Sequence, residues 1–166
     1  MRKTLILFAL ILLISGVAMA QDSPRAEVAG LYSYIRFSGG INCNGGGGSV
    51  AYNLNSWIGV VGQVGGCHFS GGNAISYLFG PKLSYRSAGR FDPFAQVLFG
   101  GARFSATGFS SNAFAMTAGG GLDIKVSDHF AIRVAQVDYL MTRFAGTRQN
   151  NFQYSGGVVF RFGQTK

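Results

Sequence analysis

The last regular stretch of the sequence, residues 151–162, alternates between two kinds of side chain. Its odd positions are mostly polar and include Gln153, Ser155 and Arg161. Because successive side chains of a strand point to opposite faces, a period of two predicts a strand with one apolar side and one polar side. The even positions, which form the apolar side, are Phe152, Tyr154, Gly156, Val158, Phe160 and Phe162.

The first 20 residues predict a secretory signal peptide. Arg2 and Lys3 precede an uncharged apolar run over residues 5–14, and a small-x-small ending closes at Ala20. The apolar run is too short for a membrane-spanning helix, which needs about 20 residues. We expect cleavage after Ala20, which leaves residues 21–166 as one exported domain.

Seven further stretches with a period of two precede the last one. The chain has 26 glycines and is 14% aromatic and 12% charged, a composition too apolar for a disordered segment. Hydrocarbon tolerates no unpaired backbone groups, so strands that meet a membrane must form a closed sheet. The sequence therefore predicts an all-β fold, an eight-stranded antiparallel up-and-down transmembrane β-barrel. The seven stretches are residues 27–36, 47–54, 56–69, 75–86, 93–104, 113–125 and 129–142, and the longer connections are 39–46, 70–74, 105–112 and 145–150.

Two predicted strands depart from a regular pattern. In the seventh, Arg133 has the opposite parity to Gln136 and Asp138, so a regular strand would turn a charge toward lipid. Either a β-bulge near Val134 and Ala135 returns all three to the interior, or Asp138 lies at the membrane rim. In the fourth, Pro81 requires a bulge or a missing ladder bond.

The end of the chain resembles a known family. Ser155, Gly157, Phe160 and Phe162 match the polar-x-Gly-x-x-aromatic-x-aromatic ending of bacterial outer-membrane β-barrels, although four residues follow the final Phe. The phrase SVAYNLNSWIGVV at residues 49–61 is similar to members of the same group. The whole exported chain resembles the small eight-stranded barrels of the OmpA transmembrane domain and OmpX. The resemblance implies an outer-membrane location, a monomer, and recognition of that ending by the insertion machinery.

A barrel of eight strands has an interior filled by side chains, so the inward charges should pair with one another. Closing the barrel sets the last strand beside the first and brings Arg161 near Glu27. We expect a closed lumen, with a narrow ion path as the alternative. The interior polar network is predicted to contain Glu27, Lys82, Asp123, Arg133 and Arg161.

The two cysteines fall at the same predicted end of the barrel. Cys43 is in the first extracellular connection and Cys67 is near the outer end of the third strand. In an oxidising compartment this placement predicts a disulfide, worth about 3 kcal/mol in the chain-entropy model. Two free cysteines are the alternative.

Basic residues gather at the predicted extracellular end, where no connection contains Asp or Glu. Guanidinium groups there suit the phosphates of lipopolysaccharide-type headgroups in outer-membrane lipid. They are spread around a rim rather than gathered in a patch, which disfavours nucleic acid. The rim arginines are Arg36, Arg103, Arg143 and Arg148, and two aromatic girdles are expected, the inner of Tyr52, Trp57, Phe91, Phe94 and Phe130 and the outer of Phe37, Phe69, Phe104, Phe109 and Phe144.

No catalytic, cofactor-binding or metal-ligating residue is predicted. His68 and Ser70 resemble the His and Ser of small lipid-A hydrolase barrels, but no nearby acid completes a triad. The sequence therefore favours a non-enzymatic outer-membrane protein with a structural or surface-interaction role. The alternatives are a narrow porin-like channel, a lipid-modifying barrel enzyme, and a soluble lipocalin-like binding barrel with an apolar interior.

Overall fold

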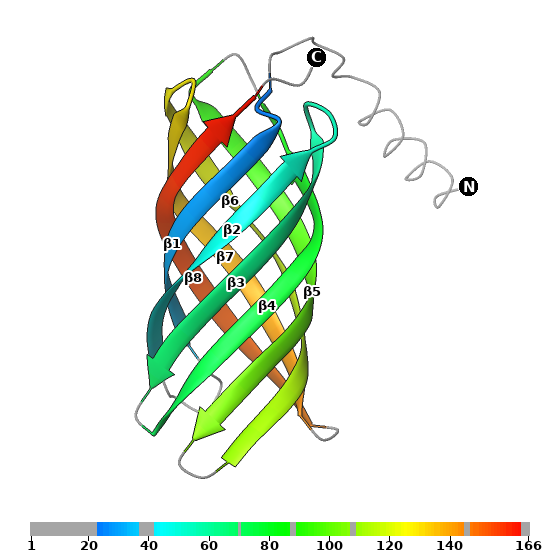
Figure 1. Ribbon diagram of the computed structural model, residues 1–166, viewed down its shortest axis with the longest axis vertical. Coiled ribbons are helices and arrows are strands. Elements are labelled where there is room, and N and C mark those ends of the chain that lie inside the picture. Colours follow the sequence, from blue (N-terminus) through cyan, green and yellow to red (C-terminus); the bar gives the residue numbers. More distant parts are fainter. Residues whose placement is uncertain are drawn as a thin grey trace, which may run out of the picture.

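The chain folds as a single closed β-barrel (Figure 1). The computed structural model describes residues 23–36, 42–69, 71–86, 89–106, 109–144 and 147–163. Each strand pairs antiparallel with the next, and β8 pairs with β1 to close the barrel. The predicted all-β fold and its eight strands are confirmed. The strands are β1 (Ala26–Arg36), β2 (Asn42–Asn53), β3 (Ile58–Phe69), β4 (Gly72–Ser84), β5 (Phe91–Ala106), β6 (Phe109–Ser127), β7 (Phe130–Phe144) and β8 (Thr147–Phe162).

The two ends of the barrel differ, and we name them by the course of the chain. The terminal end is where β1 begins near Ser23 and β8 ends near Gly163, together with the turns that follow β2, β4 and β6. The far end is opposite, where β1, β3, β5 and β7 end and β2, β4, β6 and β8 begin. Between β3 and β4, Gly71 has a positive φ of 107°, a conformation that glycine adopts without steric cost. Among the described residues, no helix is long and apolar enough to cross a membrane.

The barrel wall is apolar outside and polar inside. Phe79 is 71% exposed and Phe160 is 47% exposed on the outer face, whereas Lys82 and Arg161 are 2% and 4% exposed in the lumen. Exposed Phe, Tyr, Val and Ile side chains occur on the outer face of all eight strands. A soluble barrel of the lipocalin type would need the opposite arrangement, so this alternative is excluded.

The predicted β-bulge in β7 is confirmed. Arg133 pairs with Asp123 of β6, whereas Ala135 pairs with the neighbouring Leu122, so β7 contains one extra residue at this level. The β7–β8 ladder shifts register at the same place. Val134 and Ala135 both face outward, and Arg133, Gln136 and Asp138 all face the lumen. The bulge thus places Asp138 inside the barrel rather than at the rim.

The proline of β4 interrupts one ladder only. Pro81 pairs with Val60 of β3, but the β4–β5 register passes from Phe79 directly to Lys82. The Pro81 ring faces outward and is exposed. Because proline has no backbone N–H, only the pairing of β4 with β5 is interrupted at this position. This agrees with the missing ladder bond that the sequence predicted.

Several strands extend farther toward the far end than their composition predicted. β2 begins at Asn42 rather than at Gly47, and β6 begins at Phe109 rather than at Ala113. β8 begins at Thr147 rather than at Asn151. The Gly, Ser and Asn residues of these segments read as turn residues, but ladder pairing with a neighbouring strand overrides that weak local preference.

Candidate functional site

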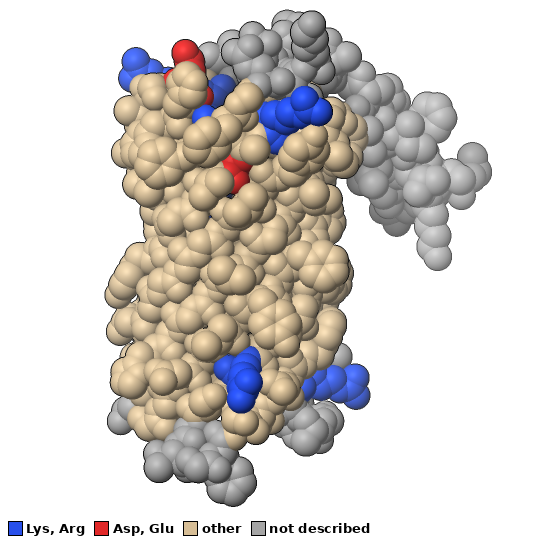
Figure 2. Space-filling view, in the orientation of Figure 1, with Lys and Arg blue, Asp and Glu red and all other residues tan. Residues whose placement is uncertain are grey.

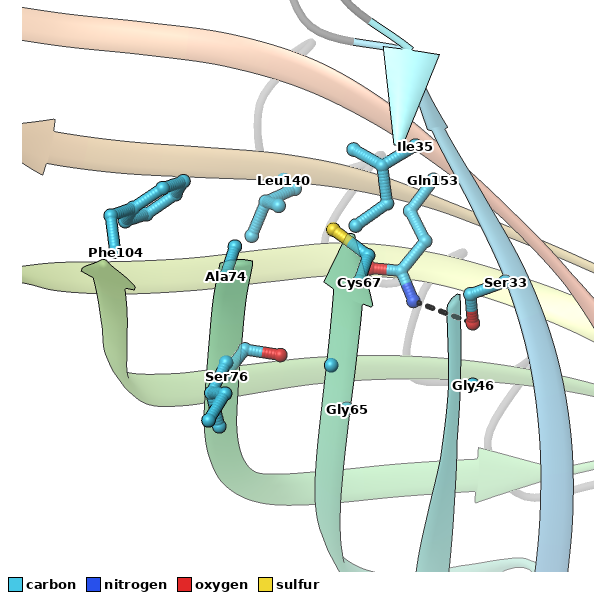
Figure 3. Close-up of a pocket in the computed structure, with 12 residues that line it drawn as sticks. Ser33, Ile35, Gly46, Gly65, Cys67, Ala74, Ser76, Phe104, Leu140 and Gln153 are labelled. Atoms are coloured by element: carbon cyan, nitrogen blue, oxygen red, sulfur yellow. Dashed lines mark hydrogen bonds between the residues drawn. The ribbon is translucent and has the colours of Figure 1, made fainter. Parts of the chain in front are cut away.

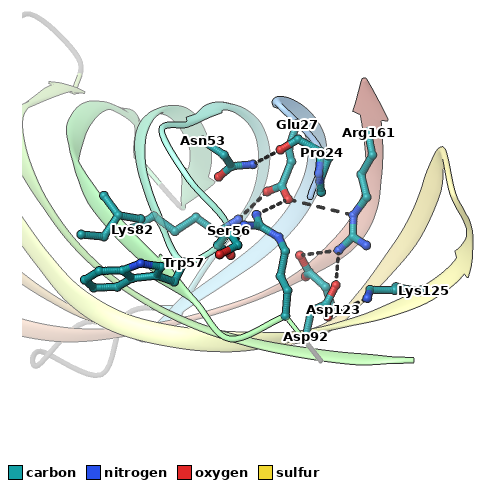
Figure 4. A network of polar contacts seen from close by, with 12 residues as sticks. Pro24, Glu27, Asn53, Ser56, Trp57, Lys82, Asp92, Asp123, Lys125 and Arg161 are labelled. Atoms are coloured by element: carbon teal, nitrogen blue, oxygen red, sulfur yellow. Dashed lines mark hydrogen bonds and ion pairs between the residues drawn. The ribbon is translucent and has the colours of Figure 1, made fainter. Parts of the chain in front are cut away.

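The terminal half of the lumen holds a cluster of charged side chains, which we call the ionic layer. Glu27 is at its centre, with Oε2 2.6 Å from Lys82 Nζ and Oε1 2.8 Å from Arg86 Nη2. Arg161, its cross-strand partner on β8, has Nε 4.0 Å from Oε1 (Figure 4). The ionic layer consists of Glu27, Lys82, Arg86, Asp92, Asp123, Lys125, Arg133 and Arg161.

A second group of contacts completes this layer. Arg133 donates two hydrogen bonds to Asp123, from Nε at 2.7 Å and from Nη2 at 3.0 Å. Arg161 Nη2 lies 3.0 Å from Asp92 Oδ2 and 4.0 Å from Asp123 Oδ2, and Lys125 Nζ lies 3.3 Å from Asp92 Oδ1. Buried charges are tolerated only when they are paired, so the layer acts as one network that links β1, β4, β5, β6, β7 and β8.

The structure brings together the five residues predicted for the interior and adds residues that the sequence analysis missed. Arg86 and Asp92 were assigned to the end of a strand and to a turn, but both face the lumen and are 8% and 3% exposed. The alternation along each strand could have identified both residues as inward-facing. Arg86 continues the inward row of Lys82 and Ser84, and Asp92 begins the inward row that contains Gln96.

Phe94 was predicted in the inner aromatic girdle, and this prediction is wrong. Its ring is 6% exposed inside the barrel, with Lys82 Nζ 4.7 Å and the Arg133 guanidinium carbon 4.3 Å from its centroid. Gly121 is its cross-strand partner on β6, where a Cβ atom would lie 2.7 Å from the ring. The absent side chain of Gly121 thus makes room for an aromatic ring that supports two cations by cation–π contact.

The predicted outer girdle also needs correction. Phe69 and Phe104 are only half-exposed, and both pack against interior clusters at the far end. Phe37 and the side chains of Phe109 and Phe144 lie outside the described residues. At the terminal end, Tyr52, Trp57 and Phe91 are exposed on the outer face, as a girdle requires.

The middle of the lumen is filled by amide groups and apolar side chains. Gln136 accepts a hydrogen bond from Arg133 Nη1 at 2.9 Å and donates to Asp138, which also lies 3.4 Å from Gln96 Nε2. Leu98, which is 0% exposed, belongs to an apolar cluster that crosses the same lumen. That cluster consists of Ala51, Val61, Leu78, Leu98, Ala102, Ala115 and Leu140.

At the far end, a disulfide joins Cys43 and Cys67 inside the barrel. Cys43 lies within β2 rather than in a connection, and the two residues are 0% and 8% exposed. Beside them is a small cavity, lined in part by Ser33 and Gln153, whose side chains share a hydrogen bond of 3.3 Å (Figure 3). The cavity volume of about 30 Å³ has room for one or two water molecules and no larger ligand.

Three of the four predicted rim arginines have described side chains. Arg36, Arg103 and Arg143 are exposed at the far end, and the side chain of Arg148 lies outside the described residues. On the face drawn in Figure 2, charged atoms lie near the two ends of the barrel and the belt between them is uncharged. Asp128, the described carboxylate on the outer surface, is in a turn at the terminal end.

The remaining candidates have separate environments. His68 is exposed at the far end, with Nδ1 2.6 Å from Asn73 Oδ1, and Ser70 lies outside the described residues. In the closing segment, Phe160 and Phe162 face outward, whereas Ser155 faces the lumen and contacts Ser33 at 2.8 Å.

An antiparallel barrel with an apolar belt, a filled polar lumen and charges at its two ends defines an integral outer-membrane β-barrel. The chain belongs to the family described as "Outer membrane protein beta-barrel domain", which matches residues 6–162. No curated protein matches the chain.

Several solved structures share the fold. Neisserial surface protein A aligns with a TM-score of 0.61 at 14% identity, over 82% of this chain and 96% of that one. The N-terminal β-barrel domain of OprF from Pseudomonas aeruginosa aligns with a TM-score of 0.60 at 16% identity, over 86% and 100% of the two chains. OprG from the same organism gives a TM-score of 0.61 at 12% identity, over 86% and 97%. At these identities the likeness shows the fold alone.

Proposed function

We propose that this protein is a sealed outer-membrane barrel with a structural or surface-interaction role, rather than a channel or an enzyme. The observation that carries the proposal is the filled lumen. The ionic layer, the amide groups around Gln136 and the cluster around Leu98 occupy successive parts of the interior.

The ionic layer supports a seal because each of its cations contacts a carboxylate and each of its carboxylates contacts at least two cations. Glu27 contacts Lys82 and Arg86 at 2.6 and 2.8 Å, and Asp123 binds Arg133 through two hydrogen bonds. An ion entering this layer would have to break charge-assisted hydrogen bonds in a medium of low dielectric, where they are strong. A non-catalytic role is supported by the contact of His68 with an amide oxygen rather than with a carboxylate.

The proposed route to the membrane follows from the two ends of the sequence. Residues 1–20 would be removed after Ala20, and the insertion machinery would read Ser155, Gly157, Phe160 and Phe162. The outward aromatic pair Phe160 and Phe162 is consistent with a signal presented on the barrel surface. We propose that the mature protein is a monomer, with its terminal end toward the periplasm.

Four measurements on the purified mature chain test the proposal: detergent solubility, gel mobility, bilayer conductance and lipid turnover. Membrane insertion predicts solubility only in detergent and a gel mobility that changes on boiling, because a closed barrel resists unfolding by detergent. Sealing predicts no single-channel steps in a planar lipid bilayer. Reproducible steps from heat-modifiable protein would overturn the seal, and lipid-A or phospholipid turnover that disappears in His68→Ala would favour the enzyme alternative.

A further inference from the structure

The far-end arginines are not equivalent, and two of them flank one strand. Arg103 of β5 is the cross-strand partner of Asn112 on β6, and Arg143 of β7 is the partner of Phe114 on β6. Asn112 and Phe114 are two residues apart and therefore face the same side, and all four side chains are exposed on the outer face. Neighbouring strands are about 4.8 Å apart and residues along a strand rise about 3.4 Å, so the two arginines start about 12 Å apart on either side of β6.

No carboxylate competes for these guanidinium groups. Neither Arg103 nor Arg143 forms an ion pair with any described residue, and the sequence has no Asp or Glu between Asp92 and Asp123 or after Asp138. Glu27, Asp92, Asp123 and Asp138 are turned into the lumen. The outer wall over β5, β6 and β7 therefore carries two unneutralised cations with an amide donor between them.

The position of Arg103, Asn112 and Arg143 along the barrel axis indicates which kind of anion they would bind. Phe114 lies beside Arg143 and is 53% exposed, and Phe99 and Tyr139, four residues nearer the middle of the barrel on β5 and β7, are each 40% exposed. Arg103, Asn112 and Arg143 thus lie at the boundary between the surface that contacts acyl chains and the polar end. An anion attached to acyl chains fits both surfaces, because its chains would cover the aromatic side chains while its headgroup meets the arginines.

We propose that Arg103, Asn112 and Arg143 form a binding site for the phosphate headgroup of a membrane lipid. Each arginine would donate paired hydrogen bonds to phosphate oxygens, Asn112 would donate a third contact, and Phe114 would pack against an acyl chain. This assignment rests on the proposed membrane placement and makes it specific, since it assigns the lipid to one face of the barrel rather than to the whole rim.

The test measures bound lipid by native mass spectrometry of the folded protein in detergent. The probes are phosphatidic acid and phosphatidylcholine with the same acyl chains, and inorganic phosphate alone. We expect selective retention of phosphatidic acid, a loss of about tenfold in affinity for Arg103→Gln and again for Arg143→Gln, and a partial loss for Arg143→Lys, which keeps the charge but not the paired hydrogen bonds.

Arg36→Gln is the matched control, because Arg36 is exposed at the same end but lies on β1, where its partners are Asn42 and Phe152. An equal loss in Arg36→Gln would overturn the local site and show attraction by the whole rim. Displacement of the lipid by millimolar inorganic phosphate would overturn the assignment to a lipid. Boiling-dependent mobility is checked for each variant, and wild-type protein without it would refute the membrane placement itself.

Discussion

Glu27 of β1 and Lys82 of β4 are joined across the lumen by a contact of 2.6 Å, although they lie 55 residues apart and on strands that do not pair. Both side chains are 3% exposed. Arg86 and Arg161 contact the same carboxylate from two further positions. The Glu27 carboxylate therefore balances the charge of cations on both β8 and the β4 side of the barrel. We expect its substitution to have the largest effect on stability.

Replacing Glu27 with Gln should destabilise the barrel by about 3–5 kcal/mol. The change removes the central negative charge and leaves Lys82 and Arg86 buried without it, and an uncompensated buried charge is strongly unfavourable. The free energy of unfolding is measured in urea with the protein in lipid vesicles. Asp128→Asn is the matched control, because that carboxylate is exposed in a turn and should change stability by less than about 0.5 kcal/mol. Equal effects of the two substitutions would contradict the central role of Glu27.

Adding a methyl group at Gly121 should destabilise the barrel by about 1–3 kcal/mol, because the new Cβ would overlap both the Phe94 ring and the carbonyl oxygen of Ala135. Gly62→Ala is the control, since a Cβ atom there meets nothing within 4 Å. The cost of Gly121→Ala should shrink in a Phe94→Leu background, which a double-mutant cycle measures. A cost independent of residue 94 would show that the ring does not require this glycine.

Removing the disulfide by Cys43→Ala with Cys67→Ala should lower the free energy of unfolding by about 3 kcal/mol. A reductant should produce a similar drop in the wild type and no change in the double variant, which serves as the control for nonspecific effects of the reductant. Thiol labelling of unfolded, unreduced protein gives an independent reading. Labelling of both cysteines under those conditions would exclude the bond.

Deleting Ala135 should leave the barrel able to assemble, because the β7 bulge contains one extra residue and a regular strand without it keeps Arg133, Gln136 and Asp138 inside. Deleting Val137 instead makes Gln136 and Asp138 neighbours, so one of these polar side chains must turn toward lipid. If it is Asp138, the charge costs about 2 kcal/mol or more. Boiling-dependent mobility after refolding compares the two deletions. Failure of the Ala135 deletion alone would mean that the bulge itself is needed for closure.

Sequence reasoning recovered the face that each strand turns to lipid, since that depends on local alternation. The rows that contain Phe79, Phe114 and Phe160 face outward as their parity predicted. It also located the β7 bulge, because Arg133 is at an odd position and Asp138 at an even one, and a regular strand would place the two charges on opposite faces. It was weakest at the far end, where the segment from Asn42 to Gly46 looks like a turn and becomes a strand through pairing with β1 and β3.

The sequence alone thus determined a closed eight-stranded sheet, its inside and its outside, because side-chain direction in a strand is set by position along the chain. Closure of the sheet also predicted that Arg161 lies near Glu27, its cross-strand partner, but only the tertiary structure decided the other contacts among the inward charges. Asp92 and Arg161 are neighbours at 3.0 Å, and the Phe94 ring contacts both Lys82 and Arg133, through closure of the barrel rather than through any spacing along the chain. Contacts across a lumen depend on the tilt and stagger of all eight strands together, and alternation along one strand contains no information about them.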